Sequence, residues 1–282
     1  MTTTYYFSAW LNQLKKYQPV WTQIESALKN ENESYALLPD TKDIWVRDFM
    51  PFQRHDGKLV LYRYTPDYLR GNNSKYITDC RETLLSSGIF NEPQLSECLL
   101  TDLIIDGGNM ISCTDKNGKH CVIMTNKVLY ENPTETYHDI IARLENILKA
   151  EVILIPWDTE ERYGHSDGMI RSLETGKLLM NCYADIDPEF GDALKKSLID
   201  RFDIQELKYG KEHREKSWCH LNYLELSNAI LVPTASIASD KVALKELEQL
   251  TGKRSIPISM AQIITEGGAM HCISWNMTTL TH

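Results

Sequence analysis

A cysteine follows a glycine pair near the end of this 282-residue chain, in Glu266-Gly267-Gly268-Ala269-Met270-His271-Cys272. An earlier stretch, Asp106-Gly107-Gly108-Asn109-Met110, repeats the acid, the two glycines and the methionine in register, and Ser112 stands there in place of Cys272. Such internal similarity indicates a repeated fold in which several modules each deliver a loop to a common site. A thiol that only one copy carries is the candidate nucleophile of an enzyme.

Two histidines could activate this thiol as a general base, His165 and His271. A histidine near a cysteine can take up its proton and later protonate the leaving group. We favour His165, because His271 is adjacent to Cys272 and neighbouring side chains of an extended strand point to opposite faces. Asp167 follows His165 by two residues, the spacing of one strand face, so one of the pair could serve chemistry while the other binds substrate.

Three aspartates, Asp48, Asp106 and Asp167, indicate the class of substrate. Negative charge around a thiol raises its pKa and opposes formation of the thiolate. A cationic substrate would cancel that penalty. Guanidinium is the natural fit, because it is planar, stays charged at pH 7 and offers forked N–H donors that two aspartates can bind around an electrophilic carbon.

Each of these features also has a structural explanation. A single cysteine is more often a small buried hydrophobic residue. A His-x-Asp pair often belongs to a turn or the surface, and a metal site built from His165, Asp167 and Cys272 is a weak alternative. Trp45 fits a role in core packing, and Arg47 fits a structural ion pair as well as a substrate contact. We assign the structural explanation to the remaining cysteines, Cys80, Cys98, Cys113, Cys121, Cys182 and Cys219.

Helix and strand patterns alternate along the whole chain. Helical spacing of apolar residues predicts helices over residues 10–28 (one helix or two short ones meeting at Pro19), 140–148, 190–202 and 244–250, so that a helix is the first element. Apolar strands are predicted at residues 152–155, 204–207 and 255–258, and a hairpin around residues 115–118. Units of roughly 50 to 60 residues would then recur about five times as blades around an axis. A doubly wound sheet is the alternative, but no glycine-rich phosphate loop is present.

Composition bounds the class of protein. Apolar residues make up 42% of the chain and no linker-like stretch divides it, which favours a single domain over residues 1–282. No signal peptide and no apolar window of about 18 residues is found, so we expect a cytoplasmic protein without a membrane partner. Seven cysteines without a CxxC pair indicate reduced thiols, and a net charge of −9 disfavours nucleic acid as a partner.

With these residues assembled, the chain resembles the agmatine deiminase and bacterial (Porphyromonas-type) peptidyl-arginine deiminase family of the guanidine-modifying, or pentein, superfamily. The resemblance implies a fivefold pseudo-symmetric α/β propeller built from repeated strand-helix-strand units. It rests on five segments in chain order: Trp45-Val46-Arg47-Asp48, Asp106-Gly107-Gly108-Asn109, Gly164-His165-Ser166-Asp167-Gly168, Ser217-Trp218-Cys219-His220-Leu221-Asn222 and Gly267-Gly268-Ala269-Met270-His271-Cys272.

The resemblance also implies a catalytic role for three residues. Cys272 would attack the guanidinium carbon to give a covalent amidino-thioether. His165 would protonate the departing ammonia and then activate water. Asp106 would orient His165 or support its charge. No cofactor and no metal are implied.

Substrate contacts are implied for a second set of residues. Asp48 and Asp167 would bind the guanidinium nitrogens, and Asn222 would line the pocket. Trp45 and Arg47 are further candidate contacts. The expected reaction is hydrolysis of a guanidine to a ureido product and ammonia, on a small cation such as agmatine, which would give N-carbamoylputrescine and serve polyamine metabolism.

The chain departs from the family in three respects. Met50 stands where glycine is usual after the Arg-Asp pair, which puts the shape of the pocket near Asp48 in question. The chain is also shorter than typical agmatine deiminases and lacks their early Thr-Trp-x-x-Trp-Pro stretch. Peptidyl arginine and free arginine therefore remain alternative substrates. Amidine transfer to an amine is an alternative reaction, and a non-catalytic binding module on the same fold is the alternative from another class.

Overall fold

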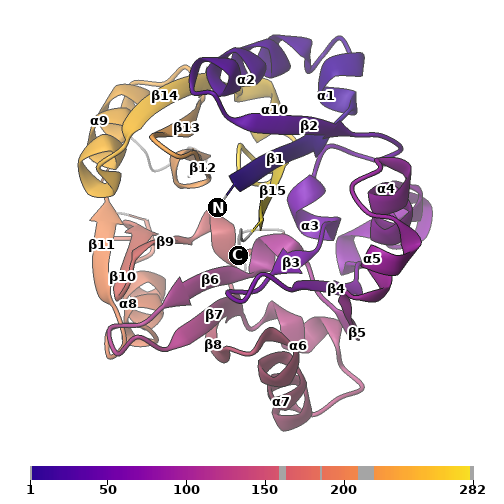
Figure 1. Ribbon diagram of the computed structural model, residues 1–282. Coiled ribbons are helices and arrows are strands. Elements are labelled where there is room, and N and C mark those ends of the chain that lie inside the picture. Colours follow the sequence, from indigo (N-terminus) through magenta and orange to yellow (C-terminus); the bar gives the residue numbers. More distant parts are fainter. Residues whose placement is uncertain (1, 159–162, 185, 209–218, 280–282) are drawn as a thin grey trace.

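Five sheets of three strands each surround a central axis in the computed structural model, which describes residues 2–158, 163–184, 186–208 and 219–279. Figure 1 shows these sheets as the blades of a ring, with the longer helices on its outside. The predicted fivefold α/β propeller is thereby confirmed.

All five blades have the same strand arrangement. The first strand pairs antiparallel with the second, and the second pairs parallel with the third. Blade by blade, the strands are β15 (Ser274–Thr279), β1 (Thr2–Ser8) and β2 (Ser34–Leu38); β3 (Phe52–Gln53), β4 (Leu59–Arg63) and β5 (Leu99–Ile104); β6 (Ile111–Thr114), β7 (His120–Thr125) and β8 (Glu151–Ile155); β9 (Ile170–Glu174), β10 (Lys177–Asn181) and β11 (Asp203–Leu207); β12 (Leu224–Glu225), β13 (Ala229–Thr234) and β14 (Arg254–Ser259).

Helices connect the second strand of each blade to the third. Two parallel strands need a crossover connection, which a helix commonly supplies. These connecting helices are α1 (Trp10–Gln13), α2 (Gln18–Asn30), α4 (Cys80–Ser86), α5 (Glu92–Ser96), α6 (Lys127–Glu131), α7 (Tyr137–Leu148), α8 (Pro188–Lys196) and α9 (Ser239–Thr251). Helix α7 shows the local logic, because Thr136 caps its first turn and Ile140, Leu144 and Leu148 form its buried stripe.

The ring closes where the last strand meets the first. Strand β15 pairs antiparallel with β1, with Trp275 opposite Tyr6. The indole Nε1 of the buried Trp275 donates a hydrogen bond to the carbonyl oxygen of Pro51 at 2.7 Å. Cys272 lies two residues before β15, so closure of the ring determines the position of the candidate nucleophile.

Most of the predicted elements are confirmed, and the differences have local causes. The predicted hairpin is β6 and β7, joined by a turn in which Asp115 Oδ1 accepts from Asn117 N and Lys119 N. The predicted helix over residues 190–202 already ends at Lys196. The prediction of a helix as first element was wrong, because β1 precedes it. The threonines and aromatic residues of β1 suit a strand, and its partner β15 is remote in the sequence.

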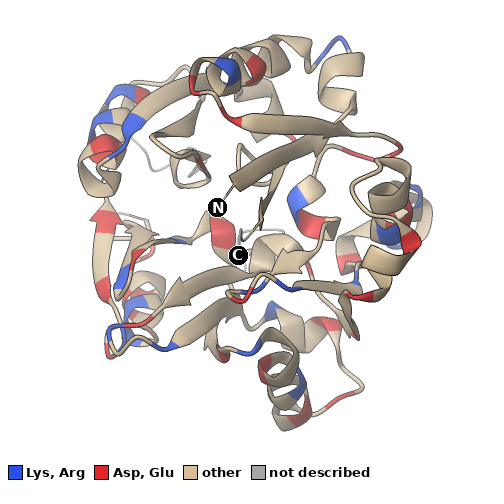
Figure 2. Ribbon diagram, viewed as in Figure 1, with Lys and Arg blue, Asp and Glu red and all other residues tan. Residues whose placement is uncertain are grey.

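The N-terminal helical pattern is divided into two helices, α1 and α2, with Pro19 in the first turn of α2. None of the described helices is long and apolar enough to cross a membrane. Figure 2 shows acidic and basic residues interspersed over the outer helices, without a large face of one sign in this view.

Candidate active site

The five segments that connect one blade to the next carry the candidate site residues. Each segment leaves the third strand of a blade and enters the first strand of the following blade. In chain order they contain α3 (Val46–Phe49), η3 (Gly107–Asn109), η4 (Ser166–Gly168), η6 (Cys219–Leu221) and α10 (Ala261–Ile264). The repeated fold therefore explains why five short motifs, spread over the chain, can line a common site.

Cys272 is held in a turn before β15 by hydrogen bonds from two other segments. The side-chain Oδ1 of Asn222 accepts from the backbone N–H groups of His271 at 2.9 Å and of Cys272 at 3.2 Å. The backbone N–H of Arg47 donates to the carbonyl oxygen of Cys272 at 3.1 Å. Asn222 also lines a cavity beside Cys272, so it both borders this cavity and holds the backbone of the candidate nucleophile.

His165 lies between two carboxylates. Its Nε2 is 2.9 Å from Asp106 Oδ2, and its Nδ1 is 3.6 Å from Asp48 Oδ1. Gly108 permits this approach, because a Cβ at that position would lie 2.6 Å from His165 Nδ1 and 2.8 Å from Asp48 Oδ1. The backbone N–H of Gly108 donates to Asp48 Oδ1 at 3.2 Å. Gly108, in the first Gly-Gly copy, therefore allows His165 and Asp48 to lie side by side.

Asp167 pairs with His271 and not with His165. His271 Nδ1 is 2.6 Å from Asp167 Oδ2, and the same carboxylate oxygen is 3.7 Å from Cys272 Sγ. The sequence predicts that the side chains of His271 and Cys272 point to opposite faces of an extended strand. Residues 270–273 form a turn instead. The expected strand spacing of His165 and Asp167 is also absent, since Asp167 lies in the 3₁₀ helix η4.

The charges of this cluster are strongly perturbed. Burial and the carboxylates of Asp167 and Asp48 raise the pKa of the Cys272 thiol well above its ordinary value. Burial opposes a charge on His165, yet Asp48 and the hydrogen bond to Asp106 raise its pKa to about 10. Burial and the nearby arginines Arg171 and Arg47 hold the pKa of His271 well below its ordinary value. The free site therefore holds a neutral thiol, an imidazolium at position 165 and a neutral His271.

Asp48 completes this cluster of titratable groups. Burial raises the pKa of its carboxyl to about 8, against the lowering effect of His165. Asp48, Asp106 and Asp167 are all buried, and Cys272 is 9% exposed. A cation that entered beside the thiol would favour ionisation of both Asp48 and Cys272.

Two cavities border Cys272 and His165. The larger has a volume of about 330 Å³, and its wall includes Asp48, Trp45 and Glu266. The other measures about 230 Å³ and is bordered by Asp167, Asn222 and Gly268. Aromatic side chains are prominent in the wall of the larger cavity: Trp10, Tyr17, Trp45, Tyr64, Tyr68, Tyr76 and Tyr163.

Two residues singled out in the sequence lie elsewhere. The guanidinium of Arg47 donates from Nη2 to Asn276 Oδ1 at 3.0 Å and lines a different cavity from Cys272. Met50 is 1% exposed and packs among Val46, Phe49 and their apolar neighbours, so its side chain does not border the two cavities at Cys272. The structure thus separates Arg47 and Met50 from the remaining candidates.

Several neighbours of the catalytic candidates were not found by sequence reasoning. The ammonium of the buried Lys127 lies 3.7 Å from Asp106 Oδ2 and 3.4 Å from Glu131 Oε1. The hydroxyl of Tyr68 donates to Asp106 Oδ2 at 3.2 Å. The i,i+4 spacing of Lys127 and Glu131 is the only signal in the sequence, and it fits an ordinary surface pair equally well. Within the described part of the chain, no cluster of three or more His, Cys, Asp or Glu residues could hold a metal ion.

Comparison with known proteins identifies relatives over nearly the whole chain. A family model described as the Porphyromonas-type peptidyl-arginine deiminase matches residues 2–277. A protein of Lactococcus lactis subsp. lactis (strain IL1403) that carries the provisional name agmatine deiminase is 22% identical over 311 aligned positions, covering 93% of this chain and 83% of that protein.

Solved structures share the fold. A variant of the C. jejuni agmatine deiminase with substrate bound has a TM-score of 0.71 at 18% identity, with 98% of this chain and 92% of that chain covered. The agmatine deiminase of Enterococcus faecalis has a TM-score of 0.73 at 16% identity, with 97% and 92% covered. Because the family model spans nearly all of the sequence, the chain belongs to the Porphyromonas-type peptidyl-arginine deiminase family, and it is a hydrolase that acts on the C–N bonds of guanidines.

Proposed function

We propose that this protein hydrolyses the guanidinium group of a small cationic substrate such as agmatine, through a covalent intermediate on Cys272. One observation carries the proposal. The thiol of Cys272 lies 3.7 Å from Asp167 Oδ2 and shares its cavities with His165. A nucleophile, an acid-base group and a carboxylate for the substrate nitrogens thus border the same space.

The first half of the reaction forms the covalent intermediate. Asp48 and Asp167 bind the guanidinium N–H groups, which places the electrophilic carbon near Cys272 Sγ. As the cation binds, the Cys272 thiol loses its proton to solvent, and the resulting thiolate attacks this carbon to give a tetrahedral adduct. His165, already protonated in the free site, donates its proton to the departing nitrogen, the C–N bond breaks and ammonia leaves. The product of this half is an amidino-thioether.

The second half releases the ureido product. His165 has lost its proton and can now accept one from a water molecule, which attacks the same carbon. The C–S bond breaks and the electron pair returns to Cys272 Sγ, while the remaining hydroxyl of the adduct loses its proton to form the C=O group and the sulfur is reprotonated to the thiol. Asp106 holds the His165 ring through Nε2 at 2.9 Å and supports its positive charge. The carbon ends as a urea group.

Electrostatics supports a cationic substrate. The raised pKa of Cys272 keeps the thiol protonated until positive charge arrives. A guanidinium beside Asp48 and Asp167 supplies that charge and lowers the cost of forming the thiolate. Binding and activation are therefore coupled, which protects the buried thiol when no substrate is present.

The larger cavity supports a small substrate with a second cation. Its volume of about 330 Å³ is at the lower end of the range for small-molecule sites. Glu266 lies in its wall, held by the hydroxyl of Tyr17 at 2.6 Å and the ammonium of Lys16 at 3.1 Å. Lys16 lines the same wall and neutralises part of this charge, so Glu266 gives only a small preference for the amine of agmatine over the carboxylate of free arginine. Relatives that carry the name agmatine deiminase also favour this substrate.

The test is an assay of ammonia release and ureido formation against agmatine, arginine, arginine methyl ester and an arginine-containing peptide. We expect agmatine to be turned over fastest, and Cys272→Ala to reduce the rate by about 10⁴-fold or more. Cys113→Ala, which removes a buried thiol from another part of the fold, serves as the matched control. Turnover of arginine or the peptide alone would overturn the choice of agmatine. Amidine transfer to an added amine would establish a transferase, and silence on all four substrates would favour a binding module.

A further inference from the structure

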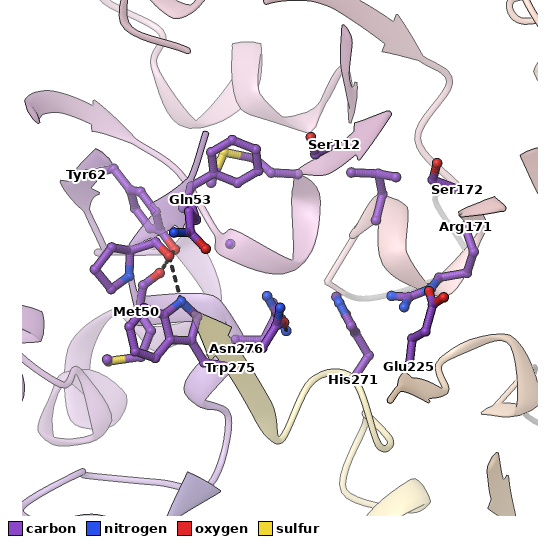
Figure 3. Close-up of a pocket in the computed structure, with 16 residues that line it drawn as sticks. Met50, Gln53, Tyr62, Ser112, Arg171, Ser172, Glu225, His271, Trp275 and Asn276 are labelled. Carbon is purple, nitrogen blue, oxygen red and sulfur yellow. Dashed lines mark hydrogen bonds between the residues drawn. The ribbon is translucent and has the colours of Figure 1, made fainter. Parts of the chain in front are cut away.

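A third cavity, with several polar side chains in its wall, lies behind the turn that carries Cys272. It measures about 260 Å³ and shares no lining residue with the two cavities at the thiol. Figure 3 shows Arg171, Glu225, His271 and Asn276 around it, with Ser112 and Ser172 on another side. Neither the proposed reaction nor the binding of a guanidinium uses this space.

Two guanidinium groups line this cavity. Arg171 is 9% exposed, and its guanidinium carbon lies 4.8 Å from the ring of Tyr223. Arg47 donates to Asn276 Oδ1, but its buried Nε has no hydrogen-bond partner. Within the described part of the chain, neither guanidinium forms an ion pair with a carboxylate at 4.0 Å or less. Arginines that are this buried normally have an anionic partner.

The charge balance of the cavity is positive. Glu225 is the one carboxylate in its wall, and its Oε1 already pairs with Lys253 Nζ at 2.8 Å. Burial and the nearby charge of Arg171 lower the pKa of Arg47 to about 10, against the opposing effect of the Asp167 carboxylate. The depressed pKa of His271, which also lines the cavity, has the same two arginines among its causes. An anion would relieve this concentration of positive charge.

We propose that this cavity, which we call the arginine pocket (Arg47, Arg171, Ser112, Ser172 and His271), binds a small phosphate-type oxyanion. The forked N–H donors of Arg47 and Arg171 suit the oxygens of such a group. The hydroxyls of Ser112 and Ser172 are additional donors in the wall. Free phosphate and a small phosphate monoester share this chemistry, and the volume admits either.

The arginine pocket is connected to the catalytic centre through a hydrogen bond. His271 lines the pocket, and its Nδ1 is 2.6 Å from Asp167 Oδ2, the carboxylate nearest Cys272. An anion beside Arg171 would weaken the positive potential at the His271 ring and raise the pKa of that histidine. Occupancy of the pocket is therefore visible in the imidazole resonances of His271.

The experiment is a calorimetric titration of inorganic phosphate into the full-length protein at constant ionic strength, repeated with a small phosphate monoester and with chloride. We expect saturable phosphate binding and no comparable binding of chloride. Arg171→Gln should weaken the affinity by about tenfold or more, because a charged hydrogen-bonded partner is lost. Lys245→Gln, which removes one positive charge from the exposed face of α9, is the matched control and should bind as the wild type does.

Two outcomes would overturn the proposal. The first is the absence of saturable phosphate and monoester binding to the wild-type protein. The second is equal phosphate affinity in Arg171→Gln and Lys245→Gln. The two arginines would then serve only to balance the charge of the buried aspartates. If Arg171→Gln does not fold, Arg171→Lys keeps the charge but loses the fork, and its affinity should fall by about threefold or more. Unchanged His271 resonances on addition of phosphate to the wild type would equally refute the site.

Discussion

Lys127 is a buried cation next to the His165–Asp106 pair, and its removal should destabilise the protein. Its ammonium lies 3.3 Å from Asp67 Oδ1, 3.4 Å from Glu131 Oε1 and 3.7 Å from Asp106 Oδ2. Unit charges about 4 Å apart attract each other by about 4 kcal/mol at an effective dielectric constant near 20. Desolvation offsets much of this gain, but removal of one partner leaves an uncompensated buried charge and costs about 3–5 kcal/mol.

Lys127→Met keeps the length and apolar stem of the side chain while removing its charge. We expect the free energy of unfolding, measured by urea titration near neutral pH, to fall by about 3–5 kcal/mol. Lys245→Met, an exposed lysine on α9, should change it by less than about 0.5 kcal/mol. Adding Glu131→Gln to Lys127→Met should recover part of the loss, because one of the unpaired buried carboxylates is then neutral.

The same substitution should change the pH dependence of catalysis. Lys127 and His165 share the same oxygen of Asp106, so loss of the ammonium removes a positive charge beside the imidazolium. The pKa of His165, which is already raised to about 10, should then rise further. We expect the alkaline limb of kcat/KM for Lys127→Met to move to higher pH by about one unit. Stability equal to that of Lys245→Met, together with an unmoved alkaline limb, would show that Lys127 does not act on this pair.

Three further results are expected. Asn222→Ala removes the oxygen that accepts hydrogen bonds from the N–H groups of His271 and Cys272. The value of kcat should therefore fall by about 10²-fold in steady-state assays. An unchanged kcat would contradict a positioning role for Asn222. Met50→Ala should lower the free energy of unfolding in urea by about 2–5 kcal/mol, because the side chain fills the core. Its kcat should stay within about threefold of the wild-type value, because the side chain does not border the cavities at Cys272. A large change in kcat at unchanged stability would contradict this prediction. The folded-state pKa of His165 is raised from 6.5 to about 10, so its stabilisation is complete below the lower value and is lost as pH rises through the higher one. His165→Gln should therefore flatten this part of the stability profile in urea titrations at several pH values, and an equally steep profile would show that His165 is not its source.

Local sequence patterns were sufficient to find the connecting segments of the propeller. The acid-glycine-glycine copies at residues 106–108 and 266–268 mark places where backbone and side chains approach closely, and Gly267 has a φ of +107°. Helix α7 was predictable for a similar reason, since its apolar stripe depends on residues three and four positions apart. Such signals are contained within a few neighbouring residues.

Contacts between remote segments were not predictable in this way. Strand β1 pairs with β15 at the other end of the chain, and no pattern among neighbouring residues predicts that pairing. The Asp167–His271 hydrogen bond depends on a turn where the sequence suggested a strand. The place of Lys127 behind Asp106 likewise follows only once the third blade packs against the second.

In the proposed reaction, Cys272 forms a covalent bond to the guanidinium carbon. Intact-protein mass spectrometry on samples quenched with acid during turnover of agmatine would detect this bond. We expect a mass increase equal to the substrate minus ammonia, mapped by proteolysis to the peptide that contains Cys272, and no such increase in Cys272→Ala. Turnover at the wild-type rate by Cys272→Ala, or an adduct on a different residue, would contradict it.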